Sequence, residues 1–155
     1  MTISVTAAVA VVLTQPLLAQ AKITPTAPGT SGDPVWQGVV RSNDGRTFVT
    51  DGGFIIDAAL AKPATVPERE FPSRLLDTYF GESHTDEYGL SDLRAVPGGN
   101  TYRTPSGIAL NATYINYLRR TLSSGSVRLR LTGGNRPIVI VVKGVLVGAF
   151  MPVQQ

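Results

Sequence analysis

The fold of this chain is decided by residues 108–140, which read IALNATYINYLRRTLSSGSVRLRLTGGNRPIVI. The apolar residues 108–110 predict a short strand, and Asn111 is a residue type that favours the start of a helix. The helix is predicted to continue through Thr121, before the Ser-Ser-Gly sequence that ends it. Three strands are then predicted over 127–131, 137–142 and 145–151.

The predicted helix is amphipathic. Ile115, Leu118 and Leu122 recur at helical spacing, so they share the face that packs against a sheet. The other side carries the polar and basic side chains Asn116, Arg119 and Arg120. This side is therefore the part of the helix that is available to solvent or to a ligand.

The first half of the chain repeats the same order of elements less clearly. A strand over 2–5 and an apolar helix that starts at Thr6 and ends near Pro16 are followed by strands over 35–40, 47–50 and 54–56. Asn43-Asp44-Gly45 predicts a hairpin turn between two of these strands. We therefore expect an α+β fold in which a strand-helix-strands unit occurs twice, within a single domain over 1–155.

Residues 61–107 interrupt this pattern. They contain five prolines and clustered charges, with little periodicity. The sequence predicts an insertion or a long irregular connection here, which carries one or two short helices such as one over 73–80.

Charge divides the chain into two parts. Residues 1–100 contain seven Lys/Arg and eleven Asp/Glu, whereas residues 101–155 contain seven Lys/Arg and no acid. An acid-free basic segment of this length is a plausible surface for a polyanion, although it is also compatible with a face that only aids solubility. The absence of cysteine excludes disulfides and thiolate metal sites.

Residues 108–140 resemble the second half of a domain of the bacterial DNA polymerase III beta sliding clamp. The end of the chain, Gly148-Ala-Phe-Met-Pro-Val153, is similar to the C-terminal Met-Pro strand of that family. Residues 35–56, with Thr50-Asp51-Gly52, are similar to its early strands and its Thr-Asp-Gly turn. The two blocks cover about two thirds of the chain.

The resemblance implies a sliding-clamp domain, with two helices packed on one side of curved antiparallel sheets. Such domains join edge to edge into a homo-oligomeric ring whose helices face double-stranded DNA, and they tether DNA polymerase and other replication proteins without catalysis. By position it implies an apolar pocket for client peptides formed by Thr50, Gly52, Phe54, Met151, Pro152 and Val153. Beta clamps carry three such domains in each chain, whereas this sequence has room for one.

The expected DNA contacts are basic or polar side chains that meet backbone phosphates without reading base sequence. Arg119 and Arg120 are expected to project from the polar side of the helix. Arg128 and Arg130 alternate with apolar residues, so they share one face of a strand. The full predicted set is Lys22, Asn116, Arg119, Arg120, Arg128 and Arg130.

Three alternatives remain open at the level of sequence. Residues 1–21 contain an apolar run and an Ala-Gln-Ala triplet, which predict an exported, sheet-rich protein with a cleaved signal. A clamp-derived module that binds proteins and encircles nothing is the second. The third is a hydrolase or divalent-cation site around His84 with Glu82, Asp86 and Glu87, although a solvated acidic loop is the simpler interpretation. We expect a cytoplasmic, non-enzymatic protein without cofactor, metal or membrane partner.

Overall fold

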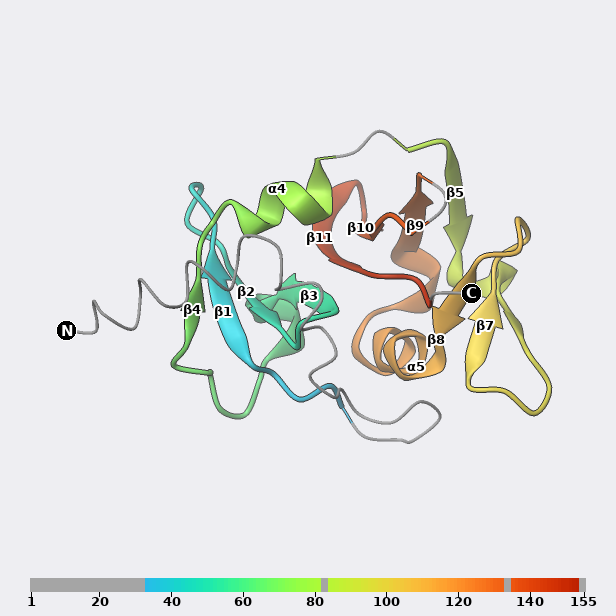
Figure 1. Cartoon of the computed structure of the whole chain (residues 1–155), viewed down its shortest axis with the longest axis horizontal. Coiled ribbons are helices and arrows are strands. Elements are labelled where there is room, and N and C mark those ends of the chain that lie inside the picture. Colours follow the sequence, from blue (N-terminus) through green and yellow to red (C-terminus); the bar gives the residue numbers. More distant parts are fainter. Residues whose placement is uncertain (1–32, 82–83, 133–134, 154–155) are drawn as a thin grey trace.

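The computed structural model describes residues 33–81, 84–132 and 135–153 (Figure 1). Within these residues the chain is mixed α+β, with eleven strands in two sheets and three α-helices. This confirms the predicted class. The strand and helix predicted over 2–15, the alternative signal over 1–21, and Lys22 lie outside the described residues.

The larger sheet contains eight strands and curves around the molecule (Figure 1). In spatial order they are β4 (Glu70–Phe71), β1 (Gly38–Arg41), β2 (Thr47–Thr50), β3 (Phe54–Asp57), β11 (Val145–Phe150), β10 (Ile138–Val142), β9 (Val127–Leu131) and β5 (Asp86–Gly89). The sequence predicted antiparallel sheets. The larger sheet is mixed instead, because β4 pairs with β1 in parallel. The first and second halves of the chain join where β3 pairs with β11.

The smaller sheet has three strands, which are β6 (Arg94–Ala95), β7 (Thr101–Arg103) and β8 (Ala109–Asn111). The α-helices are α3 (Ala58–Ala61), α4 (Leu75–Phe80) and α5 (Ala112–Thr121). Two 3-10 turns, η2 (Leu90–Asp92) and η3 (Ser124–Ser126), precede β6 and β9 respectively. The smaller sheet lies at one end of the molecule, beside α5 (Figure 1).

Helices cover both faces of the larger sheet. Tyr114, Ile115 and Leu118 of α5 belong to one buried cluster, and Leu75 and Tyr79 of α4 belong to a second cluster on the opposite face. Strand β10, with the sequence IVIVV, contributes alternate residues to the two clusters, which explains why it is apolar throughout. Helix α4 confirms the short helix predicted over 73–80. The two helices expected on one side of the sheets are α5 and the helix that starts at Thr6, and the second of these lies outside the described residues.

The elements predicted over 108–151 are confirmed. Strand β8, helix α5 and strands β9, β10 and β11 follow in the predicted order, with bounds within one residue of those expected. The Asn111 side chain accepts a hydrogen bond of 2.8 Å from the backbone N–H of Thr113, so it is the N-cap of α5. The predicted hairpin between β1 and β2 is also present.

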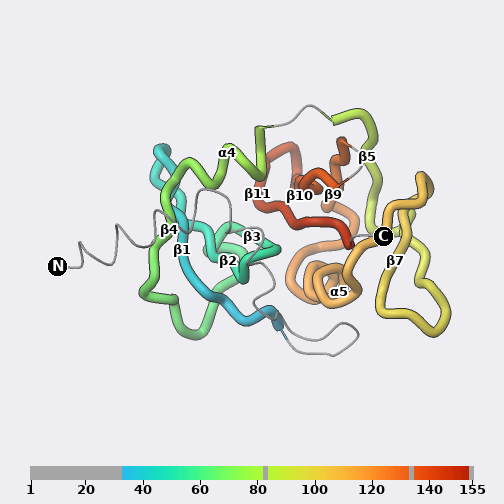
Figure 2. The backbone as a smooth tube through the Cα atoms, viewed as in Figure 1, coloured from blue at the N-terminus to red at the C-terminus, as the bar shows by residue number. Residues whose placement is uncertain are grey.

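Residues 61–107 are more ordered than the sequence indicated. They supply both edge strands of the larger sheet, β4 and β5, together with α4, η2 and two strands of the smaller sheet. Figure 2 shows β4 and β5 on opposite sides of the molecule, as the two edges of the larger sheet. These strands have two to four residues and are partly exposed, so they lack the apolar alternation by which a strand is predicted.

Candidate polyanion-binding surface

Strand β9 places two arginines on the exposed side of the larger sheet. Val127, Leu129 and Leu131 are buried, whereas Arg128 and Arg130 between them are partly exposed, as the alternation predicted. Both guanidinium groups donate to the carboxylate of Glu87 on the neighbouring strand β5. The Nε atoms of Arg128 and Arg130 lie 3.0 and 2.9 Å from its two oxygens.

One carboxylate therefore holds two guanidinium groups in fixed positions. The hydrogen bond from Arg128, followed by that from Arg130, holds the pKa of Glu87 below its ordinary value. The three side chains carry a net charge of +1, because each arginine is positive and the shared carboxylate is negative. The β9 surface is thus positive even after this pairing.

Gly89 lets the Arg128 side chain lie close to the end of β5. A Cβ atom at Gly89 would lie 3.1 Å from Nη1 of Arg128, and 3.8 Å from Oγ of Ser91. The Arg128 guanidinium is therefore next to the η2 turn, where β5 gives way to β6. This connects the β9 surface with the smaller sheet.

Arg119 is tied into the interior rather than presented to solvent. Its Nη1 donates to the Tyr102 hydroxyl at 3.0 Å and its Nη2 donates to the Leu90 carbonyl at 2.9 Å, while the guanidinium lies over the Tyr102 ring. Asn116 accepts a hydrogen bond from the same hydroxyl at 3.0 Å. In this structure Arg119 and Asn116 fasten α5 to β7 and η2, so neither is placed as a free phosphate contact.

Arg120 is the exposed basic residue of α5. Its Nη2 lies 2.9 Å from Oδ1 of Asp33, and both side chains are largely open to solvent, at 41% and 69%. Exposed ion pairs of this type contribute little stability, so a phosphate competes with Asp33 at small cost. Of the contacts predicted on the helix, Arg120 is the one that is exposed.

The segments of the predicted client pocket do come together. The backbone N–H of Met151 donates to the Gly53 carbonyl at 3.0 Å, next to the Thr50-Asp51-Gly52 turn. Their side chains, however, form core rather than a pocket wall: Thr50 and Phe54 are fully buried, and Gly52 and Pro152 are buried as well. Met151 and Val153 are the two of the six positions that are partly exposed.

Asp51 is the centre of this turn. Its Oδ1 accepts from the backbone N–H groups of Gly53 and Phe54 at 2.9 and 2.8 Å, and its Oδ2 accepts from the Tyr114 hydroxyl at 3.0 Å. Tyr79 of α4 donates to the Gly52 carbonyl at 3.2 Å. The turn is thus held by helices on both faces of the sheet, and burial raises the pKa of Asp51 to about 6.

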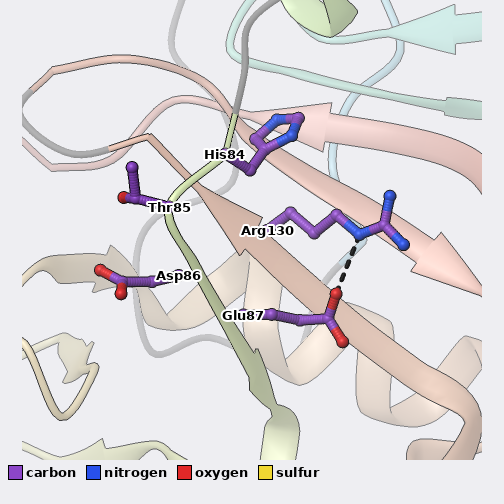
Figure 3. Close-up of a pocket in the computed structure, with 5 residues that line it drawn as sticks. All are labelled: His84, Thr85, Asp86, Glu87 and Arg130. Atoms are coloured by element: carbon purple, nitrogen blue, oxygen red, sulfur yellow. Dashed lines mark hydrogen bonds and ion pairs between the residues drawn. The ribbon is translucent and has the colours of Figure 1, made fainter.

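The residues around His84 form a shallow hollow of about 280 Å³ at the start of β5. Figure 3 shows that Asp86 and Glu87 point to opposite sides of the strand, and that the His84 ring lies away from both carboxylates. Glu87 is engaged with Arg130. Glu82 of the predicted alternative lies outside the described residues.

Among the residues that the structure describes, no three His, Asp or Glu side chains are arranged to hold a metal ion. No helix in the described ranges has the length and apolar character needed to cross a bilayer.

Comparison with protein-family models, with curated proteins and with solved structures gives no match. The resemblance to the beta clamp therefore depends on the residues quoted for it above. The structure adds the β8-α5-β9-β10-β11 unit, which has the predicted order of elements.

Sequence reasoning missed two sets of contacts that organise this surface. One is the Asp51–Tyr114 hydrogen bond, which joins residues 63 positions apart. The other is the contact of Arg119 with Tyr102 and Leu90. Because of this contact, a basic residue on the polar face of the helix holds α5 to its neighbours and is not presented to a ligand. A sequence signal was present for the first, since Asp followed by Gly-Gly is typical of a tight turn stabilised by its own side chain.

Proposed function

We propose that this domain is a non-catalytic module that binds double-stranded DNA through its phosphates and is related to sliding clamps. The observation that carries the proposal is the acid-free basic segment 101–155, which forms β7, β8, α5, β9, β10 and β11. Five of its seven cations lie at exposed positions: Arg103, Arg120, Arg128, Arg136 and Lys143.

The distribution of charge supports contact with a polyanion. The carboxylates that pair with Arg120, Arg128 and Arg130 are Asp33 and Glu87, both of which come from outside the segment. Glu87 serves two arginines at once, so pairing leaves excess positive charge on β9. Phosphate contacts of this kind give affinity without sequence preference.

The clamp resemblance extends the proposal to partners. In that interpretation the domain assembles as a homo-oligomer and binds DNA polymerase or other replication proteins through short peptides near Met151 and Val153. These two side chains are the partly exposed members of the predicted pocket, and a peptide that reaches further requires the β2–β3 turn to move.

The DNA proposal is tested by binding of a fluorescent duplex, measured by anisotropy over a series of salt concentrations. A triple variant with Arg120→Gln, Arg136→Gln and Lys143→Gln removes three exposed cations of the basic segment. We expect weaker binding and a salt slope smaller by up to about 3, since each phosphate contact contributes about 0.9.

The matched control removes the same net charge elsewhere. Arg41→Gln, Lys62→Gln and Arg74→Gln alter exposed cations in the other part of the chain, and this triple variant is expected to retain most of the affinity and slope. Equal loss in both triple variants would show that binding depends on net charge alone. No binding of the wild type at low salt would also refute the proposal.

Assembly is tested separately by light scattering over a range of concentrations. A hexamer would supply the six domains from which a closed clamp is built, and we expect it if the domain encircles DNA. A monomer at all concentrations contradicts encirclement while leaving the anisotropy result to decide DNA binding.

A further inference from the structure

A second basic feature lies where the η2 turn and the smaller sheet meet. An open hollow of about 380 Å³ is lined there by Ser91, Asp92, Arg94, Arg103 and Thr104, among others. It brings together η2, β6 and the residues that follow β7. Arg103 belongs to the basic segment 101–155, but none of the six DNA contacts predicted from the sequence lines the hollow, and none of the three cations of the triple variant does.

Two arginines line this hollow side by side. Arg94 of β6 and Arg103 of β7 are direct partners in an antiparallel pair, and both are exposed. Side chains of directly opposed residues lie on the same face of a sheet, with Cβ atoms about 5 Å apart. Like charges in this arrangement are destabilising unless an anion lies between them.

The walls of the hollow are fixed by local hydrogen bonds. Asp92, the acid in its lining, accepts a hydrogen bond of 2.9 Å from the backbone N–H of Gly89. Thr104 accepts from the backbone N–H of Ile108 at 3.0 Å, and Nη1 of Arg103 donates to the Gly107 carbonyl at 2.7 Å. The two arginines therefore line a hollow whose walls are fixed by these hydrogen bonds, and exposed Ser91 lines it as well.

A third cation borders the same wall. The Arg128 guanidinium lies beside Gly89, and a Cβ at that position would be 3.1 Å from its Nη1, 3.8 Å from Oγ of Ser91 and 3.7 Å from Oδ2 of Asp92. Since Glu87 is shared with Arg130, its charge offsets Arg128 incompletely. The potential in the hollow is accordingly positive although Asp92 contributes to it.

We propose that this hollow binds a phosphate group, with Arg94 and Arg103 as the two guanidinium groups that hold it. Guanidinium is suited to this role, because its planar set of N–H donors matches the oxygens of phosphate. Ser91 is exposed and adds a hydroxyl to the lining. The phosphate belongs either to a free phosphomonoester or to a nucleic-acid backbone, and the chemistry of the site is the same for both.

The first test uses inorganic phosphate and does not depend on DNA binding. Thermal unfolding is followed by the fluorescence of Trp36, the one tryptophan of the chain, in phosphate and in chloride at equal ionic strength. Binding to the folded state raises the midpoint temperature in proportion to the logarithm of the free phosphate concentration, once the site is mostly occupied. We expect this rise in the wild type and in Arg41→Gln, a surface control on β1.

Arg94→Gln and Arg103→Gln are expected to abolish the phosphate-dependent rise. Arg94→Gln should also unfold in chloride at the wild-type temperature or above it, because it removes one of two opposed charges. This second result distinguishes loss of a site from general damage to the fold. A phosphate-dependent rise that persists in Arg94→Gln, or a wild type that responds equally to phosphate and chloride, overturns the proposal.

The source of the phosphate is distinguished with two further probes, a nucleoside monophosphate and a short duplex. Stabilisation by the monophosphate that requires Arg94 identifies a free phosphomonoester as the ligand. A loss of duplex affinity in Arg94→Gln, without stabilisation by the monophosphate, identifies a backbone phosphate. If neither probe depends on Arg94, the assignment of the ligand to a phosphomonoester or a backbone phosphate is overturned. Failure of the basic triple variant in the duplex assay leaves the inorganic phosphate test unaffected.

Discussion

Asp51 offers a quantitative test of how the two halves of the molecule are connected. Burial raises its pKa from 3.8 to about 6 although three hydrogen-bond donors surround the carboxylate. Because the pKa is higher in the folded than in the unfolded state, the folded state binds the proton more tightly between these two values. Stability therefore falls as the pH rises from about 4 to about 6, by about 3 kcal/mol in total.

The substitution Asp51→Asn removes this titration while keeping an oxygen that accepts from the Gly53 and Phe54 N–H groups. We expect the free energy of unfolding of the wild type, relative to Asp51→Asn, to decrease by about 3 kcal/mol between pH 4 and pH 7. Urea denaturation followed by Trp36 fluorescence measures it, since Trp36 packs against Phe54 in the core beside this turn. Asp86→Asn, on exposed β5, shows what loss of one negative charge does by itself.

Parallel pH profiles for the wild type and Asp51→Asn would refute the reasoning, because desolvation would then not determine the protonation of this carboxyl. A difference of the opposite sign, with the wild type gaining stability as the pH rises, would mean that the hydrogen bonds from Gly53, Phe54 and Tyr114 outweigh burial. Either outcome would also exclude Asp51 as a source of acid stability in this protein.

Substitutions at four positions test the packing of α5, each by urea denaturation. Asn111→Ala removes the N-cap and is expected to cost about 1 kcal/mol, whereas Asn111→Ser should restore most of it; equal stability of all three proteins would contradict the capping role. Leu118→Ala, at a fully buried position, is expected to cost about 2–5 kcal/mol, and a cost near zero would mean that α5 does not pack as described. Arg119→Gln should cost about 2 kcal/mol and Arg120→Gln less than about 0.5 kcal/mol, so equal effects would remove the distinction between the internally hydrogen-bonded and the exposed arginine.

The second half of the fold was predictable because its signals are local. Helix α5 has a capping residue and an apolar face at helical spacing, and the strands that follow it are apolar runs separated by glycine-containing turns. Each of these patterns is contained in about ten residues. Strands β9 and β10 also pair with each other, so the pattern of one supports the other.

In the segment 61–107 the sequence predicted helix α4 but not the strands, because these strands pair with distant parts of the chain. Strand β4 pairs with β1, about thirty residues earlier, and β5 pairs with β9, about forty residues later. Their residues are largely charged, as in Asp86-Glu87, and carry no alternation of apolar side chains. The partner strand, rather than the local sequence, makes them strands.

In the candidate site, too, the sequence could not predict contacts between residues far apart in the chain. The sequence places Arg119 and Arg120 side by side on the polar face of one helix, with nothing to separate their roles. The structure separates them, because Tyr102 and the Leu90 carbonyl come from other elements and engage Arg119 alone. Residue type and spacing predict where a cation lies on an element, whereas its availability depends on what packs beside it.

This separation changes what the clamp resemblance implies about DNA. In a ring lined by helices, the cations of the helix face the duplex, but of the α5 cations Arg119 is engaged internally and Arg120 is the one exposed to solvent. The other exposed cations of the basic segment are Arg103 on the smaller sheet, Arg128 on β9, and Arg136 and Lys143 beside β10. DNA binding by this chain is therefore expected to use sheet and loop surfaces more than the helix. DNA affinity and ring formation are then separate properties, and we expect some substitutions to abolish one while leaving the other intact.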